Sequence, residues 1–403
     1  MTPLRHCDFR RLWLAGLISD SGDWLLLVSL PILVFELTGS TLQTSVAFLV
    51  ELAPAVLLGP FAGYLADRLD RRRLLVTVTV VQAVALLPLL AVHDRGDLPI
   101  LYAVVAVEAA MLTLFSPAKN AMLPTLVPAE QLVSANSLVG LNNNLGRLVG
   151  GPLGGLLLAA TGLPVIVVVD LCTFAVAAVL IMGIRKPGAA AGPAAVERPA
   201  AQPKERAFAS YRIRVGLTVG ALGGLAQGLF VVLFVVWVAR ELGGGAAETG
   251  LLRGIQAVGA IAAGLLLATA RRTPAPATLV VSGAGTLGLI LLVLWNAPAL
   301  TTALPLYVTL FVLVGAPGLV MATGLISLLQ QESSDRVRGR VFGVFGAVYD
   351  GSSAAGMVAA GVLGDRVGVL PMLNAQGILY LSAGAVALLL LRRTAPTLAP
   401  ATR

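Results

Sequence analysis

Residues 44–92 read TSVAFLVELAPAVLLGPFAGYLADRLDRRRLLVTVTVVQAVALLPLLAV, which is two apolar runs joined by a short charged loop. Each run has about 20 residues, the length that an α-helix needs to cross the hydrocarbon core of a bilayer. The loop between them, residues 63–73, is rich in arginine. The stretch therefore predicts two membrane-spanning helices that turn back at a basic loop.

The composition of the whole chain extends this interpretation. Of the 403 residues, 57% are hydrophobic and only 12% are charged, too few charges to coat a water-facing surface of this size. This excludes a soluble class. The formal net charge is +8, but the basic residues form short clusters between apolar runs, which favours an orientation signal over nucleic-acid binding. Cys7 and Cys172 lie far apart in sequence and form no disulfide framework or metal-ligand pattern.

The same length criterion gives twelve candidate spans along the chain. They are residues 12–35, 44–65, 74–92, 98–118, 132–160, 163–184, 215–239, 250–270, 278–295, 301–325, 341–363 and 369–391. The first run is too long for a cleavable signal peptide, and we expect it to be retained. Residues 185–214 are rich in Ala, Pro and charge, which is typical of a flexible linker. We therefore expect an all-α membrane protein with a six-helix half at 1–184, a linker at 185–214, a second half at 215–391 and a tail at 392–403.

The distribution of Lys and Arg predicts the orientation of this bundle. With twelve spans, nearly all basic residues fall on the side of the N-terminus. The opposite loops hold only Arg95, Arg240, Arg253 and Arg366. By the positive-inside rule, we expect both termini and the linker to lie in the cytoplasm.

Internal repetition supports the division into halves. Glu36-Leu37 recurs as Glu241-Leu242, and Gly150, Gly155 and Gly162 recur as Gly356, Gly361 and Gly368. Two parallel repeats of six helices place the substrate at the interface between the halves, near the middle of the membrane.

The loop at residues 63–73, GYLADRLDRRR, resembles the G-x-L-a-D-r-x-x-r-r signature of the major facilitator superfamily, with Asp70 where that signature more often has glycine. The resemblance implies that family's fold of two pseudo-symmetric six-helix halves. The conformational gate that it implies comprises Gly63, Asp67, Arg68, Arg71 and Arg72. Gly63 permits close helix approach, while Asp67 is placed to pair with a neighbouring helix end or an arginine and to release it during switching.

Two other interpretations of this loop remain. It is also consistent with a basic loop that only orients the protein. An aspartate pair that binds a metal diphosphate, as in membrane prenyltransferases, is weaker because no second aspartate-rich loop accompanies it. The corresponding stretch of the second half, residues 264–272, has Ala268 where Asp67 would fall, so that copy of the gate is degenerate.

The fifth span contains the stretch GRLVGGPLGG at residues 146–155. It resembles the G-x-x-x-G-P-x-x-G-G motif associated with antiporters of the same superfamily. The residues concerned are Gly146, Gly150, Gly151, Pro152, Gly154 and Gly155. Glycines at four-residue spacing share a helix face and allow a neighbouring backbone to pack closely, and Pro152 permits a bend. Glycine-mediated packing without any bearing on transport direction is the alternative.

Ionisable residues inside the spans are the best functional candidates, because a charge in the bilayer is costly unless it faces a wet cavity or a partner. We expect proton coupling at Asp20, Asp23, Glu108, Arg147 and Asp350, which are counted near mid-membrane and could share one cavity. Asp20 and Asp23 are three residues apart, so each favours proton retention on the other.

Arg147 is expected to be the only basic residue inside a span and therefore to pair with an acid, first Glu108 and next Asp23. A static structural ion pair is the alternative. Glu51 and Asp170 are counted nearer the outer face, where they could simply snorkel. Trp24 and Asn144 are candidates for the substrate cavity, although Trp24 could equally fill the core.

Several short stretches together resemble a bacterial drug/proton antiporter branch of the superfamily, one that includes macrolide-efflux and enterobactin-exporter-like proteins. They are Phe9-Arg10-Arg11-Leu12-Trp13, Gly22-Asp23-Trp24, Phe115-Ser116-Pro117-Ala118, Pro124-Thr125-Leu126-Val127-Pro128 and Arg338-Gly339-Arg340-Val341. The chain departs from many drug antiporters in lacking an arginine in the fourth span. Glu108 lies in that span instead. This leaves Arg147 as the candidate to replace the missing arginine in the proton relay.

The expected function is export of amphiphilic small molecules, including macrolide-like drugs, in exchange for protons by rocking of the two halves. No nucleotide-binding G-x-x-x-x-G-K-[ST] loop occurs, so the energy should come from an ion gradient. Export of an endogenous metabolite such as a siderophore, or lipid flipping, is the alternative within transport. A membrane enzyme or a scaffold is the alternative from another class, and the lack of a nucleophile or metal cluster argues against an enzyme.

We expect no cofactor, no metal and no nucleic-acid partner. The expected partners are the small-molecule substrate, protons and the lipid bilayer, and we expect a monomer.

Overall fold

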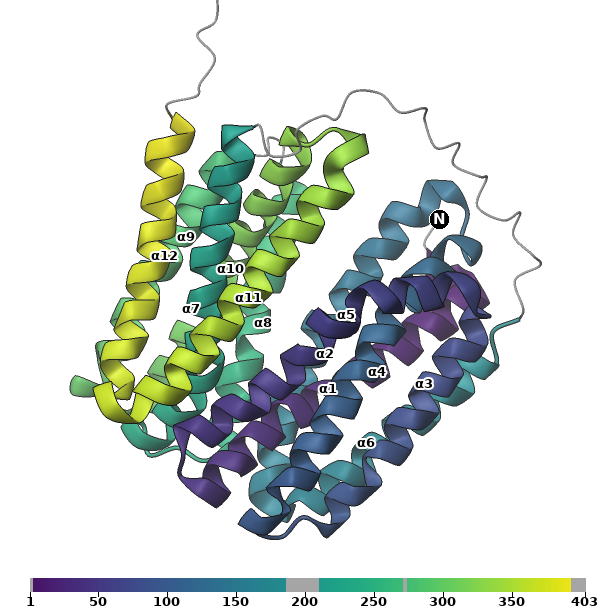
Figure 1. Cartoon of the computed structure of the whole chain (residues 1–403), viewed down its shortest axis with the longest axis horizontal. Coiled ribbons are helices and arrows are strands. Elements are labelled where there is room, and N and C mark those ends of the chain that lie inside the picture. Colours follow the sequence, from purple (N-terminus) through teal and green to yellow (C-terminus); the bar gives the residue numbers. More distant parts are fainter. Residues whose placement is uncertain (1–2, 186–209, 271–273, 393–403) are drawn as a thin grey trace, which may run out of the picture. The chain divides into compact units, whose positions relative to one another are not determined.

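The computed structural model describes residues 3–185, 210–270 and 274–392, and the regular elements in these ranges are all helices. The twelve α-helices are α1 (Cys7–Thr38), α2 (Thr41–Arg68), α3 (Arg71–Ala85), α4 (Leu98–Met122), α5 (Leu132–Thr161), α6 (Leu163–Met182), α7 (Tyr211–Glu241), α8 (Ala246–Thr269), α9 (Pro276–Asn296), α10 (Leu304–Glu332), α11 (Asp335–Val367) and α12 (Val369–Arg392) (Figure 1). The expected all-α class with twelve long helices is confirmed.

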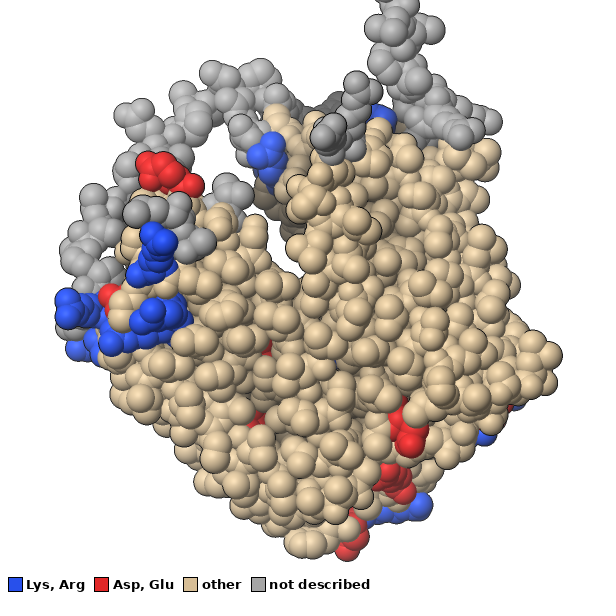
Figure 2. Space-filling model, turned by 180° about the vertical axis from the view of Figure 1, so that it is seen from behind, with Lys and Arg blue, Asp and Glu red and all other residues tan. Residues whose placement is uncertain are grey.

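The surface of these helices is suited to lipid. Eleven of the twelve are long and apolar enough to cross a membrane by length and composition. Large apolar side chains face outward along them, for example Leu57 with 75% and Leu266 with 71% of the side chain exposed. Figure 2 shows the charged residues near the edges of the face, with a broad, almost uncharged area between them. Such a surface would aggregate in water, so the chain is a multi-pass membrane protein.

Helix α5 is the exception among the twelve. It carries Arg147, the amides at residues 142–144 and six glycines within Leu132–Thr161, which lower its hydropathy. A helix of this composition is poorly suited to face lipid, and it packs against α1 instead. Polar character in α5 therefore indicates an interior position.

The helix ends differ from the predicted spans by a few residues. Helix α3 stops at Ala85, where a span to residue 92 was expected, and a 3-10 turn at Leu87–Ala91 continues the chain. Pro88 lies in that turn and has no backbone N–H to continue an α-helix. Helix α7 begins at Tyr211, inside the predicted linker. The predicted linker from residue 186 to 209, the tail from 393 onward, and Arg271 and Arg272 of the degenerate second gate lie outside the described residues.

The described residues form two compact units. The first contains α1 to α6 together with Phe234–Ala257, which is the end of α7 and the first half of α8. The second contains the rest of α7 and α8 with α9 to α12. The division into halves at residues 1–184 and 215–391 stays a prediction.

Matching turns support the expected internal repeat. Gly162 joins α5 to α6 with φ of 77°, and Gly368 joins α11 to α12 with φ of 100°. Gly39 after α1 and Gly243 after α7 also have positive φ, at 65° and 62°. Because L-residues with a Cβ avoid this backbone region, glycine allows these short turns between antiparallel helices.

Helix α1 is the central helix of the first unit. It packs against α5 on one side and against α6 and α2 on the others. Its buried side chains near one end, Phe9 and Leu12, join a core with Leu75, Phe115 and Ile181 from α3, α4 and α6. Polar residues in the middle of α1 are thereby held inside the helix bundle.

Candidate functional site

Four carboxyl groups from three helices gather in the first unit. Asp20 and Asp23 come from α1, Glu108 from α4 and Asp170 from α6, and Asp23 lies within electrostatic range of the other three and of Lys119. We call Asp20, Asp23, Glu108 and Asp170 the acid cluster. Like charges this close in a low-dielectric site are strongly unfavourable unless protons bind, so the cluster is suited to holding at least one proton.

Hydrogen bonds satisfy the acid cluster only in part. Gln82 Nε2 donates to Glu108 Oε2 at 3.0 Å, and Thr173 Oγ1 donates to Asp170 Oδ1 at 2.7 Å. The second carboxylate oxygens, Glu108 Oε1 and Asp170 Oδ2, are buried and have no hydrogen-bond partner within the described ranges. A protonated carboxylic acid would be more stable than a bare carboxylate at such an atom.

Asp170 is a correction to the sequence analysis, which placed it near the outer face as a snorkelling residue. Its side chain is fully buried. A Cβ on Gly22 of α1 would lie 1.9 Å from Asp170 Oδ1, so the absence of a side chain at Gly22 makes room for this carboxyl group. The sequence analysis estimated the depth of Asp170 in the membrane by counting residues along its helix. Burial depends instead on which face of α6 turns toward α1, and the sequence of α6 alone gives no signal for that rotation.

The expected partner of Arg147 is also wrong. Arg147 forms no ion pair with Glu108 or Asp23, all three of which are described. Its Nη2 donates to Asn144 Oδ1 at 3.4 Å, and its guanidinium lies 5.9 Å from the ring centroid of Trp24. On α5, Gly146 faces Asp20 of α1, and the next residue, Arg147, is rotated by about 100° around the helix.

Arg253 is a residue that the sequence analysis missed. It was counted among the loops on the outer side, but it lies eight residues into α8, and its guanidinium is 6.0 Å from the Trp24 ring centroid. Arg147 is therefore not the only basic residue inside a span. Arg253 lies within electrostatic range of Arg147 and of Glu51 from α2, so Glu51 also has a charged neighbour inside the protein.

The glycines of α5 pack closely against neighbouring helices on two sides. Toward α1, a Cβ on Gly150 would lie 2.3 Å from the Ser21 carbonyl oxygen, and one on Gly154 would lie 2.7 Å from that of Leu25. Toward α8, a Cβ on Gly155 would lie 2.1 Å from the Ala246 carbonyl oxygen. Whether this motif decides the direction of transport stays a prediction.

Gly150→Ala tests the contact between α1 and α5. The added methyl would have to push two helix backbones apart, so we expect a loss of about 1–3 kcal/mol in stability, measured as a lower melting temperature in detergent. Gly140→Ala on the same helix is the control, because its Cβ would meet no atom within 4 Å. Alanine's helix propensity should leave that variant as stable as the parent or more stable, and equal losses in the two variants would contradict the packing account.

The arginines of the loop at residues 63–73 bind helix ends. Arg71 Nη1 donates to the carbonyl oxygen of Ala121 at the end of α4 at 2.8 Å, and Arg72 donates to that of Met182 at the end of α6. These carbonyls lack intrahelical partners and carry the negative end of the helix dipole. Asp70 caps α3 by accepting from the Arg73 backbone N–H at 2.8 Å, which explains an aspartate at this position.

The other gate residues are less informative. Arg68 lies over the ring of Tyr64, 4.5 Å from its centroid. The side chain of Asp67 and the surroundings of Gly63 are not among those described. The switching role of the loop stays a prediction.

Asp350 lies on α11 in the second unit, beside Tyr349 and half-buried. The acid cluster and Arg147 belong to the first unit. The cavity that Asp350 was expected to share with them therefore stays a prediction.

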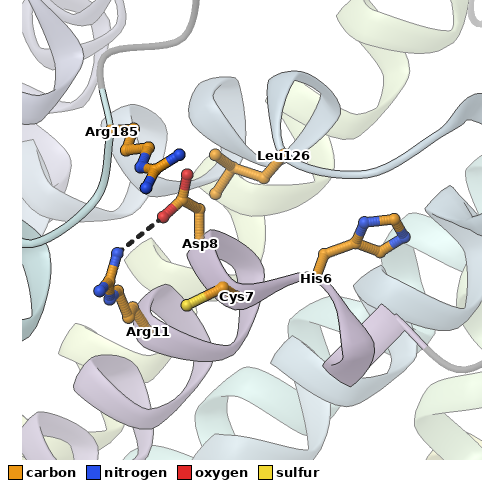
Figure 3. A pocket seen from close by; sticks show the side chains of 6 residues that line it. All are labelled: His6, Cys7, Asp8, Arg11, Leu126 and Arg185. Carbon is orange, nitrogen blue, oxygen red and sulfur yellow. Dashed lines mark hydrogen bonds and ion pairs between the residues drawn. The ribbon is translucent and has the colours of Figure 1, made fainter.

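A separate polar pocket of about 340 Å³ lies at the start of α1 (Figure 3). It is lined by His6, Cys7, Asp8, Arg11, Leu126 and Arg185. Arg11 and Asp8 form an ion pair at 3.0 Å across it. Asp8 and Asp20 are twelve residues apart on one helix, or about 18 Å along its axis, so this pocket is distinct from the acid cluster.

Comparison with known proteins agrees with this architecture. The family model described as Major Facilitator Superfamily matches residues 12–357. The multidrug efflux pump Tap of Mycolicibacterium fortuitum is 27% identical over 97% of this chain and 98% of its own length. Macrolide efflux protein A of Streptococcus pyogenes is 22% identical over 90% of each chain. The crystal structure of a bacterial homologue of the iron transporter ferroportin, in an inward-facing state, superposes with a TM-score of 0.76 at 19% identity, covering 97% of this chain and 99% of that one.

Proposed function

Because the chain belongs to the major facilitator superfamily, we propose that it is a secondary active transporter that exports amphiphilic small molecules in exchange for protons by alternating access. Two relatives that match over most of their length are named as efflux pumps, which supports export of drug-like molecules. The proposed location is the bacterial cytoplasmic membrane with both termini in the cytoplasm, in keeping with the positive-inside rule.

The acid cluster is the observation that carries the proposal. Carboxyl groups from α1, α4 and α6 share one region, where Asp170 is fully buried and the other three are half-buried. Two of their oxygens, Glu108 Oε1 and Asp170 Oδ2, are buried and have no hydrogen-bond partner in the described part of the chain. A group that is costly to ionise when buried and easy to ionise when wetted binds a proton in one conformation and releases it in another. Asp350 of the second unit is a further proposed coupling residue, to be tested separately by Asp350→Asn.

Uptake of a panel of dyes and macrolides into vesicles distinguishes an exporter of drug-like molecules from an exporter of a single native metabolite. Inside-out vesicles containing the protein are energised with a pH gradient and offered several dyes and macrolides. We expect gradient-dependent uptake of more than one compound, abolished by a protonophore. Uptake of none of them, together with retention of one native metabolite in cells that lack the protein, would favour a dedicated exporter such as one for a siderophore. Loss of lipid asymmetry in such cells would favour a flippase.

A membrane enzyme or scaffold is the alternative from a different class. Members of this family and the matched relatives are transporters, and the described residues include no group of three or more His, Cys, Asp or Glu side chains placed to hold a metal. A purified protein that turns a compound into a product without moving it across the membrane would support the enzyme.

A further inference from the structure

Two arginines approach the same aromatic ring inside the first unit. The guanidinium of Arg147 from α5 lies 5.9 Å from the Trp24 ring centroid, and that of Arg253 from α8 lies 6.0 Å from it. Both arginines are half-buried, and the two charges lie within electrostatic range of each other. Bringing like charges together in a membrane protein is unfavourable, so the arrangement calls for a compensating negative charge.

The two arginines differ in their acidic neighbours. Glu51 lies within electrostatic range of Arg253. Arg147 makes no ion pair with any carboxylate of the described residues, and its Nε is buried without a hydrogen-bond partner. Its Nη2 donates to the neutral amide of Asn144. The charge of Arg147 is therefore not balanced by a carboxylate within the described residues.

The acid cluster does not balance Arg147 either. Asp23 lies within electrostatic range of the other three carboxyl groups and of Lys119, but none of the four lies within such range of Arg147 or Arg253. Asp20 and Trp24 both face α5, where a Cβ on Gly146 would be 3.1 Å from the Asp20 Cβ and a Cβ on Gly150 would be 2.8 Å from the Trp24 Cβ. The acid cluster and the two arginines therefore form separate charge groups among the described residues.

Because two arginines share the Trp24 ring and Arg147 has no acidic partner in the described residues, we propose that Trp24, Arg147 and Arg253 bind the anionic group of an aromatic substrate, a carboxylate, sulfonate or phosphate, while the substrate's ring stacks on Trp24. A planar guanidinium donates two parallel hydrogen bonds to two oxygens of such an anion, and an indole ring offers a large flat contact. The inference rests on the proposed export function and narrows its substrates to aromatic anions. Asn144 contributes to the site by accepting a hydrogen bond from the Arg147 guanidinium.

Two dyes with the same xanthene skeleton test the charge preference: fluorescein, which is anionic, and rhodamine 6G, which is cationic. Their binding to the purified full-length protein in phosphatidylcholine nanodiscs is measured by fluorescence anisotropy, without any gradient. We expect wild-type protein to bind fluorescein at least about tenfold more tightly than rhodamine 6G. Arg147→Gln should weaken fluorescein binding about tenfold or more and leave rhodamine 6G binding unchanged, while Arg147→Lys should retain part of the affinity.

Arg240→Gln is the matched control. Arg240 also lies over an aromatic ring, 5.6 Å from the centroid of Phe35, but at the exposed end of α7. It should change neither affinity. If Arg147→Gln does not fold, as judged by its melting temperature, Arg253→Gln takes its place with the same expectation.

Three results would overturn the inference: tighter binding of rhodamine 6G, no fluorescein binding, or equal fluorescein binding by wild type and both arginine variants. Displacement of fluorescein by phosphatidylglycerol at low mole fraction would assign the site to a lipid phosphate and also overturn it. Because binding needs no gradient, fluorescein that binds through Arg147 but is never transported would instead contradict the proposed function and leave the site intact.

Discussion

Asp23→Asn should lose proton-driven uptake by more than about tenfold while retaining exchange of substrate across the membrane. Asp23 lies within electrostatic range of the three other carboxyl groups of the acid cluster, so we propose it as the group at which a proton is shared. An amide of the same shape cannot take up or release that proton. Concentrative uptake needs the proton in every cycle, but exchange of labelled for unlabelled substrate does not.

The measurement compares gradient-driven uptake with counterflow in the same proteoliposomes. Asp170→Asn is the second variant and should behave like Asp23→Asn. Glu241→Gln is the control, because this carboxyl group is exposed at the end of α7 and should tolerate the change. Equal loss of uptake and counterflow in both cluster variants would indicate structural damage, and full uptake in both would reject the coupling role.

Gly155→Ala should slow transport by more than about tenfold while leaving substrate binding within about twofold. The added methyl would lie 2.1 Å from the Ala246 carbonyl oxygen of α8. The contact is also tight from the other side, because a Cβ on Gly250 of α8 would lie 2.5 Å from the Gly151 carbonyl oxygen. Overpacking of this kind costs about 1–3 kcal/mol, which changes the ratio of two conformations by roughly 5- to 150-fold. A transporter held in one conformation binds substrate but does not cycle.

The separation of α5 from α8 is measured directly with a buried reporter. Thr249 lies in the first turns of α8 with 3% of its surface exposed, and Thr249→Cys is introduced after Cys7 and Cys172 are replaced by serine. A membrane-impermeant maleimide should label this cysteine faster in Gly155→Ala than in the parent. Gly140→Ala should label at the parental rate, and unchanged labelling and transport in Gly155→Ala would contradict a switching role for this contact.

Sequence reasoning recovered the fold because the membrane imposes a simple rule. Apolar runs of sufficient length, such as the two on either side of residues 63–73, became α2 and α3. The glycine repeat at Gly162 and Gly368 also marked real turns of positive φ. These features depend on local composition and backbone geometry, which a single sequence contains.

The site was only partly predictable because side-chain neighbours depend on helix rotation. The sequence analysis placed Asp20, Asp23 and Glu108 at a similar depth. In the structure, Asp20 and Glu108 both lie within electrostatic range of the Asp23 carboxyl group. Asp170 was given the wrong environment because its burial depends on Gly22 of a helix far away in sequence. Arg147 was assigned an acidic partner on charge balance alone, but its guanidinium lies near the Trp24 ring and makes no ion pair with Glu108 or Asp23.

Substrate-induced proton movement in proteoliposomes tests the central claim most directly. A pH-sensitive dye is trapped inside, no gradient is applied, and a compound shown to be transported in the vesicle panel is added outside. The account predicts a change in lumenal pH with wild type and with Glu241→Gln, and none with Asp23→Asn and Asp170→Asn combined. A pH change of wild-type size in the combined variant, or substrate movement by wild type without any proton movement, would contradict it.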